Sequence, residues 1–210
     1  ENKIETQGSL LQIFDLKINN NFKIIDYNYK STGSISQSQV ILKNNFTNKL
    51  FKKSIKNISL QKNKLKKILN KKNKNLLLFD GFYSLDNSEY KKFEFKHNLN
   101  KKNKKYFIDL NLTENIFLEP INFQTNSKKN SNIKAEYQLK NKKLIFKSID
   151  FTEGKNIIAI KGLVLNSKNE IEELSNIRVL TFNKKNENNN FTINFGKKIL
   201  ISGKKYDSSN

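Results

Sequence analysis

The chain has 210 residues and a formal net charge of +21, and hydrophobic residues make up 36% of it. This length favours a single domain, and the apolar content lies below the roughly 45–50% of an average globular domain. A sheet covered by helices on both faces needs near-continuous apolar strands, which this sequence lacks. The composition therefore favours a single-layer sheet or a sandwich whose strands have one apolar and one polar face.

The positive charge is carried almost entirely by lysine, since Arg178 is the only arginine among 40 basic residues. Lysine, asparagine, isoleucine and phenylalanine are abundant, as expected of a genome rich in A and T. A nucleic-acid surface usually recruits arginine for bidentate contacts to phosphate and guanine. We therefore attribute the charge mainly to genomic bias, and RNA or ribosome binding is kept as an alternative function.

Cysteine is absent, so the chain has neither a disulfide framework nor a thiolate metal site. No apolar run reaches the roughly 18–20 residues that a membrane-spanning helix requires. The chain begins at Glu1 without a signal-peptide pattern. We therefore expect a segment of a longer protein, in which any membrane anchor lies outside residues 1–210.

The amino-terminal half contains short runs in which apolar and polar residues alternate, a pattern typical of half-buried strands. These runs cover residues 14–18, 25–42, 77–83, 93–95 and 107–112. Helix signals are scarce. The best of them is one apolar turn within the lysine-rich residues 62–74, which predicts at most a short helix or a strand connection. Pro120 indicates a break or an edge position rather than a central strand.

The carboxyl-terminal half repeats the strand pattern more regularly, with Asn- and Lys-rich turns between the runs. The runs cover residues 133–139, 144–151, 156–165, 177–182, 191–195 and 199–202. Period-two runs separated by turn residues predict an antiparallel β-meander from about Phe107 to Ile201. We expect a mainly β fold of ten to twelve strands in one segment, 1–210, with its most regular repeats in 107–203.

Each alternating strand presents one apolar face, and these faces are the candidate functional surface. Burying an unpaired lysine is costly, so Lys161 is predicted to point outward. The residues predicted to point inward are Phe93, Phe95, Ile108, Leu110, Leu112, Ile133, Ala135, Tyr137, Leu139, Ile158, Ile160, Val164, Phe191, Ile193, Phe195, Ile199 and Ile201. Periodicity alone favours a sandwich in which a second sheet covers this face. The alternative is an open groove that holds acyl chains.

Residues suited to catalysis are few, and we expect neither enzyme activity nor a metal or other cofactor. His97 is the sole histidine and is predicted to be exposed at a strand end, and Asp109 has no second carboxylate nearby in sequence. No phosphate-binding glycine loop, metal-ligand spacing or nucleophile elbow is present. The lysine clusters at 62–74 and 101–105 could bind phosphates or anionic headgroups, but solvated loops are the favoured interpretation.

Two stretches resemble a known family. Residues 155–165, read as apolar-x-apolar-x-Gly-Leu-x-Leu after the Glu153-Gly154-Lys155 turn, are followed by strands near 174–178 and 199–207. Together with Phe107 to Thr113, they resemble the AsmA-like family of Gram-negative bacteria, of the YhdP and TamB type. The resemblance covers roughly residues 77–207.

The resemblance implies an elongated β-sheet curled into a groove that is lined by the inward residues named above. It implies a periplasmic protein, anchored in the inner membrane by a region outside this chain, that carries phospholipid to the outer membrane. The implied partners are phospholipid acyl chains, the membrane and other envelope proteins, and no nucleic acid. A β-sandwich interaction module is the first alternative, and an RNA- or ribosome-binding protein is the second.

Overall fold

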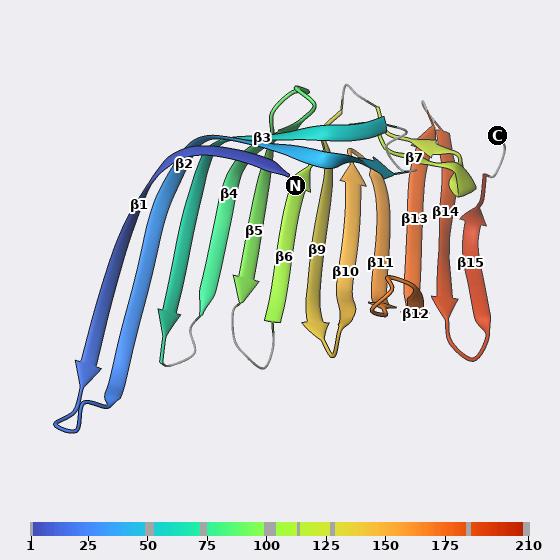
Figure 1. Cartoon of the computed structure of the whole chain (residues 1–210). Coiled ribbons are helices and arrows are strands. Elements are labelled where there is room, and N and C mark those ends of the chain that lie inside the picture. Colours follow the sequence, from blue (N-terminus) through green and yellow to red (C-terminus); the bar gives the residue numbers. More distant parts are fainter. Residues whose placement is uncertain are drawn as a thin grey trace.

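The computed structural model describes residues 2–48, 53–71, 75–98, 104–112, 114–126, 129–183 and 186–207. Within these ranges the chain consists almost entirely of β-strands, with one 3₁₀ turn and no α-helix (Figure 1). The sequence prediction of a mainly β fold with little helix is therefore confirmed.

The described residues form thirteen strands of one antiparallel sheet and two strands of a small separate sheet. In the main sheet each strand pairs with its neighbour in the order β1-β2-β3-β4-β5-β6-β9-β10-β11-β13-β14-β15, and β12 pairs with β11. The sheet is not closed, so β1 and β15 are its two edges. The elements are β1 (Lys3–Ile18), β2 (Ile24–Asn48), β3 (Lys53–Asn70), β4 (Leu76–Leu85), β5 (Lys91–Asn98), β6 (Lys104–Asn111), β7 (Phe117–Leu118), η1 (Glu119–Ile121), β8 (Phe123–Gln124), β9 (Ser131–Lys140), β10 (Lys143–Glu153), β11 (Asn156–Leu165), β12 (Ile171–Glu173), β13 (Asn176–Asn183), β14 (Asn186–Phe195) and β15 (Ile199–Lys205).

The predicted meander is confirmed, and it extends beyond its predicted limits. It begins at Lys3 rather than near Phe107, because the long strands β1, β2 and β3 continue the same sheet. Apart from the small β7–β8 sheet, no second sheet is formed by the described part of the chain. The fold is therefore a single curved layer and not a sandwich.

The amino-terminal strands bend over one face of the sheet, which we call the inner face. Figure 1 shows β1, β2 and β3 turning at the top of the sheet and running across it. We call the bent part of β2 and β3, residues 42–48 and 53–58, the arm. The opposite surface is the outer face.

A corner at Gly81 and Asn63 accompanies this bend. Gly81 has a φ of +156°, and the β3–β4 register shifts by one residue between Gln61 and Lys64. The Asn63 side chain occupies the place where Gly81 has no Cβ, and its Oδ1 accepts a hydrogen bond from the Phe82 amide at 3.1 Å. Such bulges and glycine kinks are the usual means of curving a sheet.

A second segment, the cap, covers the inner face from the β6–β9 connection. It consists of residues 114–126 and includes β7, η1 and β8. Its Ile116 and Phe123 are buried with Leu112 and with Phe151 of β10, and the rings of Phe123 and Phe151 meet edge to face at 5.7 Å. The cap lies where β6 ends and β9 begins. We call this end of the sheet the capped end, and the opposite end the open end.

Two of the predicted elements differ from the structure. Residues 62–70, predicted to be at most a short helix or a connection, belong to strand β3, where the pairing with β2 and β4 overrides the single helical apolar turn. The polar residues 183–190 were predicted to be a turn, but β14 already begins at Asn186. In both cases pairing with neighbouring strands overrides the low strand propensity of asparagine and lysine.

Candidate functional site

On the inner face, a row of paired residues crosses all strands of the main sheet except β12. Each member lies directly opposite the next, so all share a face. The central row comprises Leu10, Gly33, Leu65, Phe79, Phe95, Ile108, Ala135, Ile149, Ile160, Ile177, Ile193 and Ile201. No member is polar. Since neighbouring strands lie about 4.8 Å apart, the row is about 50 Å long.

The outer face is polar at the equivalent level, except at Ala159. The corresponding row there comprises Ser9, Ser34, Lys64, Asp80, Glu94, Asp109, Lys134, Asp150, Ala159, Arg178, Thr192 and Ser202. Lys134 and Asp109 form an ion pair across strands at 3.0 Å. The sheet is therefore amphipathic across its full width.

Towards the capped end, a second apolar row lies beneath the cap. This capped-end row comprises Phe93, Leu110, Ile133, Phe151, Ile158, Val179 and Phe191, with Gly81 and Gly203 at its ends. Leu110, Ile133 and Ile158 pack against the buried cluster that Ile116 and Phe123 of the cap form with Leu112 and Phe151. Their apolar surface is consequently used within the protein itself.

Towards the open end, a third row is mainly aromatic. This open-end row comprises Leu77, His97, Tyr106, Tyr137, Phe146 and Leu163. The Tyr106 ring stacks on His97 at 4.1 Å and on Tyr137 at 4.8 Å, between ring centroids. Tyr137 in turn contacts Phe146 at 5.1 Å. A continuous aromatic surface therefore spans four neighbouring strands near the open end.

His97 belongs to this aromatic row and is not the exposed strand-end residue that the sequence predicted. Its ring is partly buried, and its Nε2 is buried without a hydrogen-bond partner in the described part of the chain. Burial, with a smaller contribution from the charge of Lys104, lowers the pKa of His97 below its usual value. Burial also raises the pKa of Tyr137. Both shifts favour the neutral form, as an apolar surface requires.

An apolar pocket lies between the arm and the sheet at the capped end. It has a volume of about 390 Å³. Its lining comes from β2, β3, β4, β6 and the residue after β6: Leu42, Phe46, Ile55, Ile58, Tyr83, Leu85, Leu110 and Leu112. Pockets of this size and apolar lining accommodate small ligands or parts of larger ones.

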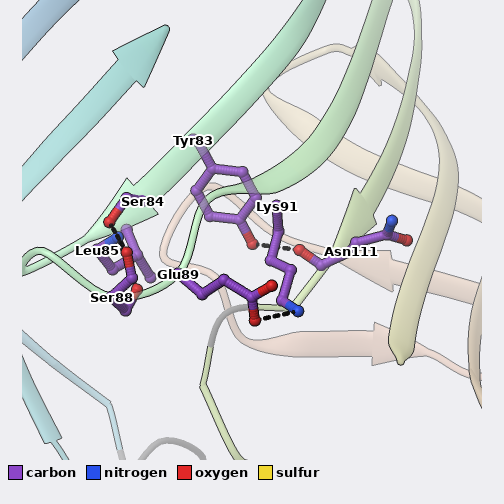
Figure 2. Close-up of polar contacts among 7 residues, drawn as sticks. All are labelled: Tyr83, Ser84, Leu85, Ser88, Glu89, Lys91 and Asn111. Atoms are coloured by element: carbon purple, nitrogen blue, oxygen red, sulfur yellow. Dashed lines mark hydrogen bonds and ion pairs between the residues drawn. The ribbon is translucent and has the colours of Figure 1, made fainter. Parts of the chain in front are cut away.

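Hydrogen bonds fix the strands and the turn that surround this arm pocket (Figure 2). The Tyr83 hydroxyl donates a hydrogen bond to the Asn111 carbonyl at 2.7 Å, which links β4 to β6. The Asp86 carboxylate accepts hydrogen bonds from the amides of Lys56 and Asn57, at 3.0 and 2.8 Å, and so attaches the arm to the β4–β5 turn. The Ser84 hydroxyl donates to the Ser88 carbonyl at 2.6 Å within the same turn. The pocket is therefore built by fixed elements.

The cap is fixed by buried polar residues that sequence reasoning missed. Glu153 is 2% exposed, and its carboxylate accepts hydrogen bonds from the Asn126 amide at 2.6 Å and from the Asn156 side chain at 2.9 Å. Asn189 donates to the Ile121 carbonyl at 2.8 Å, and the Tyr206 hydroxyl donates to the Pro120 carbonyl at 2.9 Å. The sequence around Glu153, Asn189 and Tyr206 resembles ordinary turns and polar surface. It gives no signal that these side chains hold the cap in place.

All the predicted inward residues except Val164 lie on the inner face. Phe95, Ile108, Ala135, Ile160, Ile193 and Ile201 lie in the central row, and Phe93, Leu110, Ile133, Ile158 and Phe191 in the capped-end row. Leu112 belongs to the core beneath the cap. Tyr137, Leu139, Phe195 and Ile199 lie on the same face towards the open end.

Val164 is the exception, and its predicted inward position is wrong. It pairs with Ile145, which pairs with Gln138 on the outer face. Gly162 has a φ of +63°, and β10 contains an extra residue at Lys147, so the alternation changes phase within β11. Strict alternation from Ile160 therefore assigned Val164 to the wrong face.

Comparison with protein-family models, curated protein sequences and solved structures found no match for this chain. Neither a helix long and apolar enough to cross a membrane nor a cluster of potential metal ligands occurs among the described residues. The AsmA-like resemblance therefore stays a prediction.

Proposed function

We propose that the inner face binds lipid acyl chains, and that this chain is a segment of an AsmA-like groove that conducts phospholipid across the periplasm. In this proposal the anchor in the inner membrane belongs to a region outside this chain. Phospholipid is the cargo, and no catalytic step is needed. The side chains of the central row provide the binding surface.

The observation that carries the proposal is the unbroken apolar central row. It runs perpendicular to the strands for about 50 Å, whereas the hydrocarbon core of a bilayer, two acyl chains deep, is about 30 Å thick. An acyl chain lying along the row remains in contact with apolar side chains as it moves. Exposing the same chain to water would cost about 0.8 kcal/mol for each CH₂ group.

The partial exposure of this row also supports the proposal: its members between the two edges are half-buried, apart from Ala135, which is buried. At the edge of the sheet, Ile201 is 66% exposed, and Leu10 at the opposite edge is also exposed. Monomeric proteins rarely expose large continuous apolar surfaces unless those surfaces bind something. The arm pocket offers an apolar site at the capped end, where the end of an acyl chain could be held.

Site-specific photo-crosslinking tests the proposal directly. A photo-reactive residue in place of Ile160 or Ile193 lies in the central row and is expected to capture co-purified lipid, which mass spectrometry detects. The same residue in place of Lys134 or Asn194 lies on the outer face and serves as the matched control. Equal capture from both faces, or none from either, would contradict the proposal.

RNA binding is the competing function, because the chain carries a net charge of +21. On the outer face, however, Asp80, Glu94 and Asp109 lie directly opposite one another, so the basic residues form no continuous surface there. Electrostatic binding to RNA weakens steeply as salt increases. A steep salt dependence of RNA affinity, together with no lipid in the native mass spectrum, would favour this alternative.

A further inference from the structure

The hairpin that joins β1 to β2 presents an aromatic side chain at the open end. Phe22 is 86% exposed, and its backbone has a φ of +56°, which is uncommon for a bulky residue. Asn19 fixes the turn: its Oδ1 accepts hydrogen bonds from the amides of Asn21 and Lys23, at 3.0 and 2.9 Å. The Phe22 amide also donates to the Asn19 carbonyl at 2.9 Å. The turn is therefore built so that Phe22 projects into solvent.

The residues around Phe22 are apolar and basic. Ile18 and Ile24, at the two strand ends, are each more than half exposed. Lys17 and Lys23 flank them in sequence, and Asp26 lies opposite Lys17. Figure 1 shows this hairpin projecting beyond the other turns at the same end of the sheet. An apolar tip within a basic surround is typical of segments that enter a membrane interface.

Two other turns of the open end, farther along the sheet, are also basic. Lys140 and Lys142 lie at the β9–β10 turn, and Lys197 and Lys198 at the β14–β15 turn, all exposed. The acidic residues of β12 and its turn, Glu170, Glu172 and Glu173, interrupt this surface, and Glu172 pairs with Lys143 at 2.6 Å.

The aromatic open-end row lies close behind these turns. Tyr106 and Tyr137, with partly exposed rings, are members of it. Tyrosine is enriched where protein meets the headgroup region of a bilayer, because its ring is apolar and its hydroxyl is polar.

We propose that the open end docks on an anionic phospholipid bilayer, with Phe22 inserted below the headgroups and the lysines of the turns in contact with them. This docking rests on the function proposed above in one respect: it would place the uncovered end of the inner face at the source of its cargo. A bilayer fits better than a nucleic acid, because the most exposed side chain is apolar and the described basic residues at this end are lysines.

Tryptophan fluorescence can report the insertion, because the chain contains no tryptophan. In Phe22→Trp the indole should shift to shorter wavelength, and brominated acyl chains should quench it, when vesicles of phosphatidylcholine and phosphatidylglycerol are added. Vesicles of phosphatidylcholine alone should have much less effect. Ile4→Trp is the matched control, because Ile4 is 65% exposed at the other end of the same strand. Its fluorescence should not change.

Two further variants measure the contributions to docking in vesicle co-sedimentation. Phe22→Ser should lower the partition coefficient about tenfold or more, since it removes the aromatic side chain that would enter the bilayer. Lys23→Gln should lower it about fivefold, and added salt should reduce that difference. Both side chains belong to an exposed turn, so unchanged circular dichroism and denaturation curves are expected and serve as the folding control.

Several outcomes would overturn the docking proposal: no spectral shift in Phe22→Trp, equal quenching at Phe22→Trp and Ile4→Trp, or equal binding to neutral vesicles. RNA binding without vesicle binding would overturn it in favour of a nucleic-acid partner. The crosslinking at Ile160 keeps the two proposals separate. Insertion of Phe22→Trp without lipid capture at Ile160 leaves docking and removes the groove function, whereas capture without insertion does the reverse.

Discussion

His97 is a titratable side chain of the inner face that its surroundings keep neutral. His97 lies in the open-end row, with its ring stacked on Tyr106 and its pKa lowered by burial. Protonation would place a charge between the stacked rings of the open-end row, and Lys104 nearby adds repulsion. The charge state of this single side chain therefore links the stability of the sheet to pH.

We expect the His97→Phe variant to reduce the pH dependence of stability. The lowered pKa means that the unfolded chain binds the proton more readily, so the contribution of His97 is present above about pH 6.5. It is lost as the pH falls below that value and through the folded-state pKa. Urea unfolding of the wild-type protein and of His97→Phe, between about pH 7.5 and about pH 5, measures the difference in their free energies of unfolding. The carboxylates are the same in both proteins, so their contribution cancels in this difference. Identical pH profiles would contradict this assignment.

The elements show which parts of the fold the sequence could reveal. Strand β11 has the predicted limits, Asn156 to Leu165, because its alternation is strong and a turn bounds each end. The cap was not predicted, since its apolar residues, such as Ile116 and Phe123, follow no period and are buried only by distant partners. The face of Val164 was also beyond prediction, because a bulge set by Gly162 and the neighbouring strand changes the phase.

The arm depends on the corner at Gly81, and we expect Gly81→Ala to destabilise the protein by about 1–3 kcal/mol. The added Cβ would lie 2.7 Å from the Cα of Asn63, in a backbone conformation that residues other than glycine rarely adopt. Gly196→Ala is the matched control, because a Cβ there meets its nearest neighbour at 3.9 Å in an exposed turn. Chemical denaturation of both variants gives the comparison. Equal stability of the two variants would show that the corner is not strained.

At the scale of the whole molecule, the single-layer architecture leaves an unusually large surface in contact with solvent. The accessible surface is 14683 Å², whereas a compact monomer of the same 24.6 kDa mass would expose about 10,000 Å². The excess includes the exposed ends of the central row, such as Leu10 and Ile201. A sheet without a covering layer gives up the burial that stabilises ordinary domains, so its apolar surface is available to a ligand of sufficient length.

The single-layer architecture determines how much surface area becomes exposed when the protein unfolds. The unfolded chain exposes about 36,000 Å², so folding buries about four fifths of the area that a compact protein of this mass would bury. Because the urea m-value scales with the area exposed on unfolding, we expect the lipid-free monomer to have about four fifths of the usual m-value. Equilibrium urea titration measures it, with sedimentation velocity as the check that the protein is monomeric. Bound lipid should raise the unfolding midpoint, because it binds only the folded sheet. A monomer with the m-value of a compact protein would mean that the inner face is covered in solution, and the acyl-binding surface would then not exist.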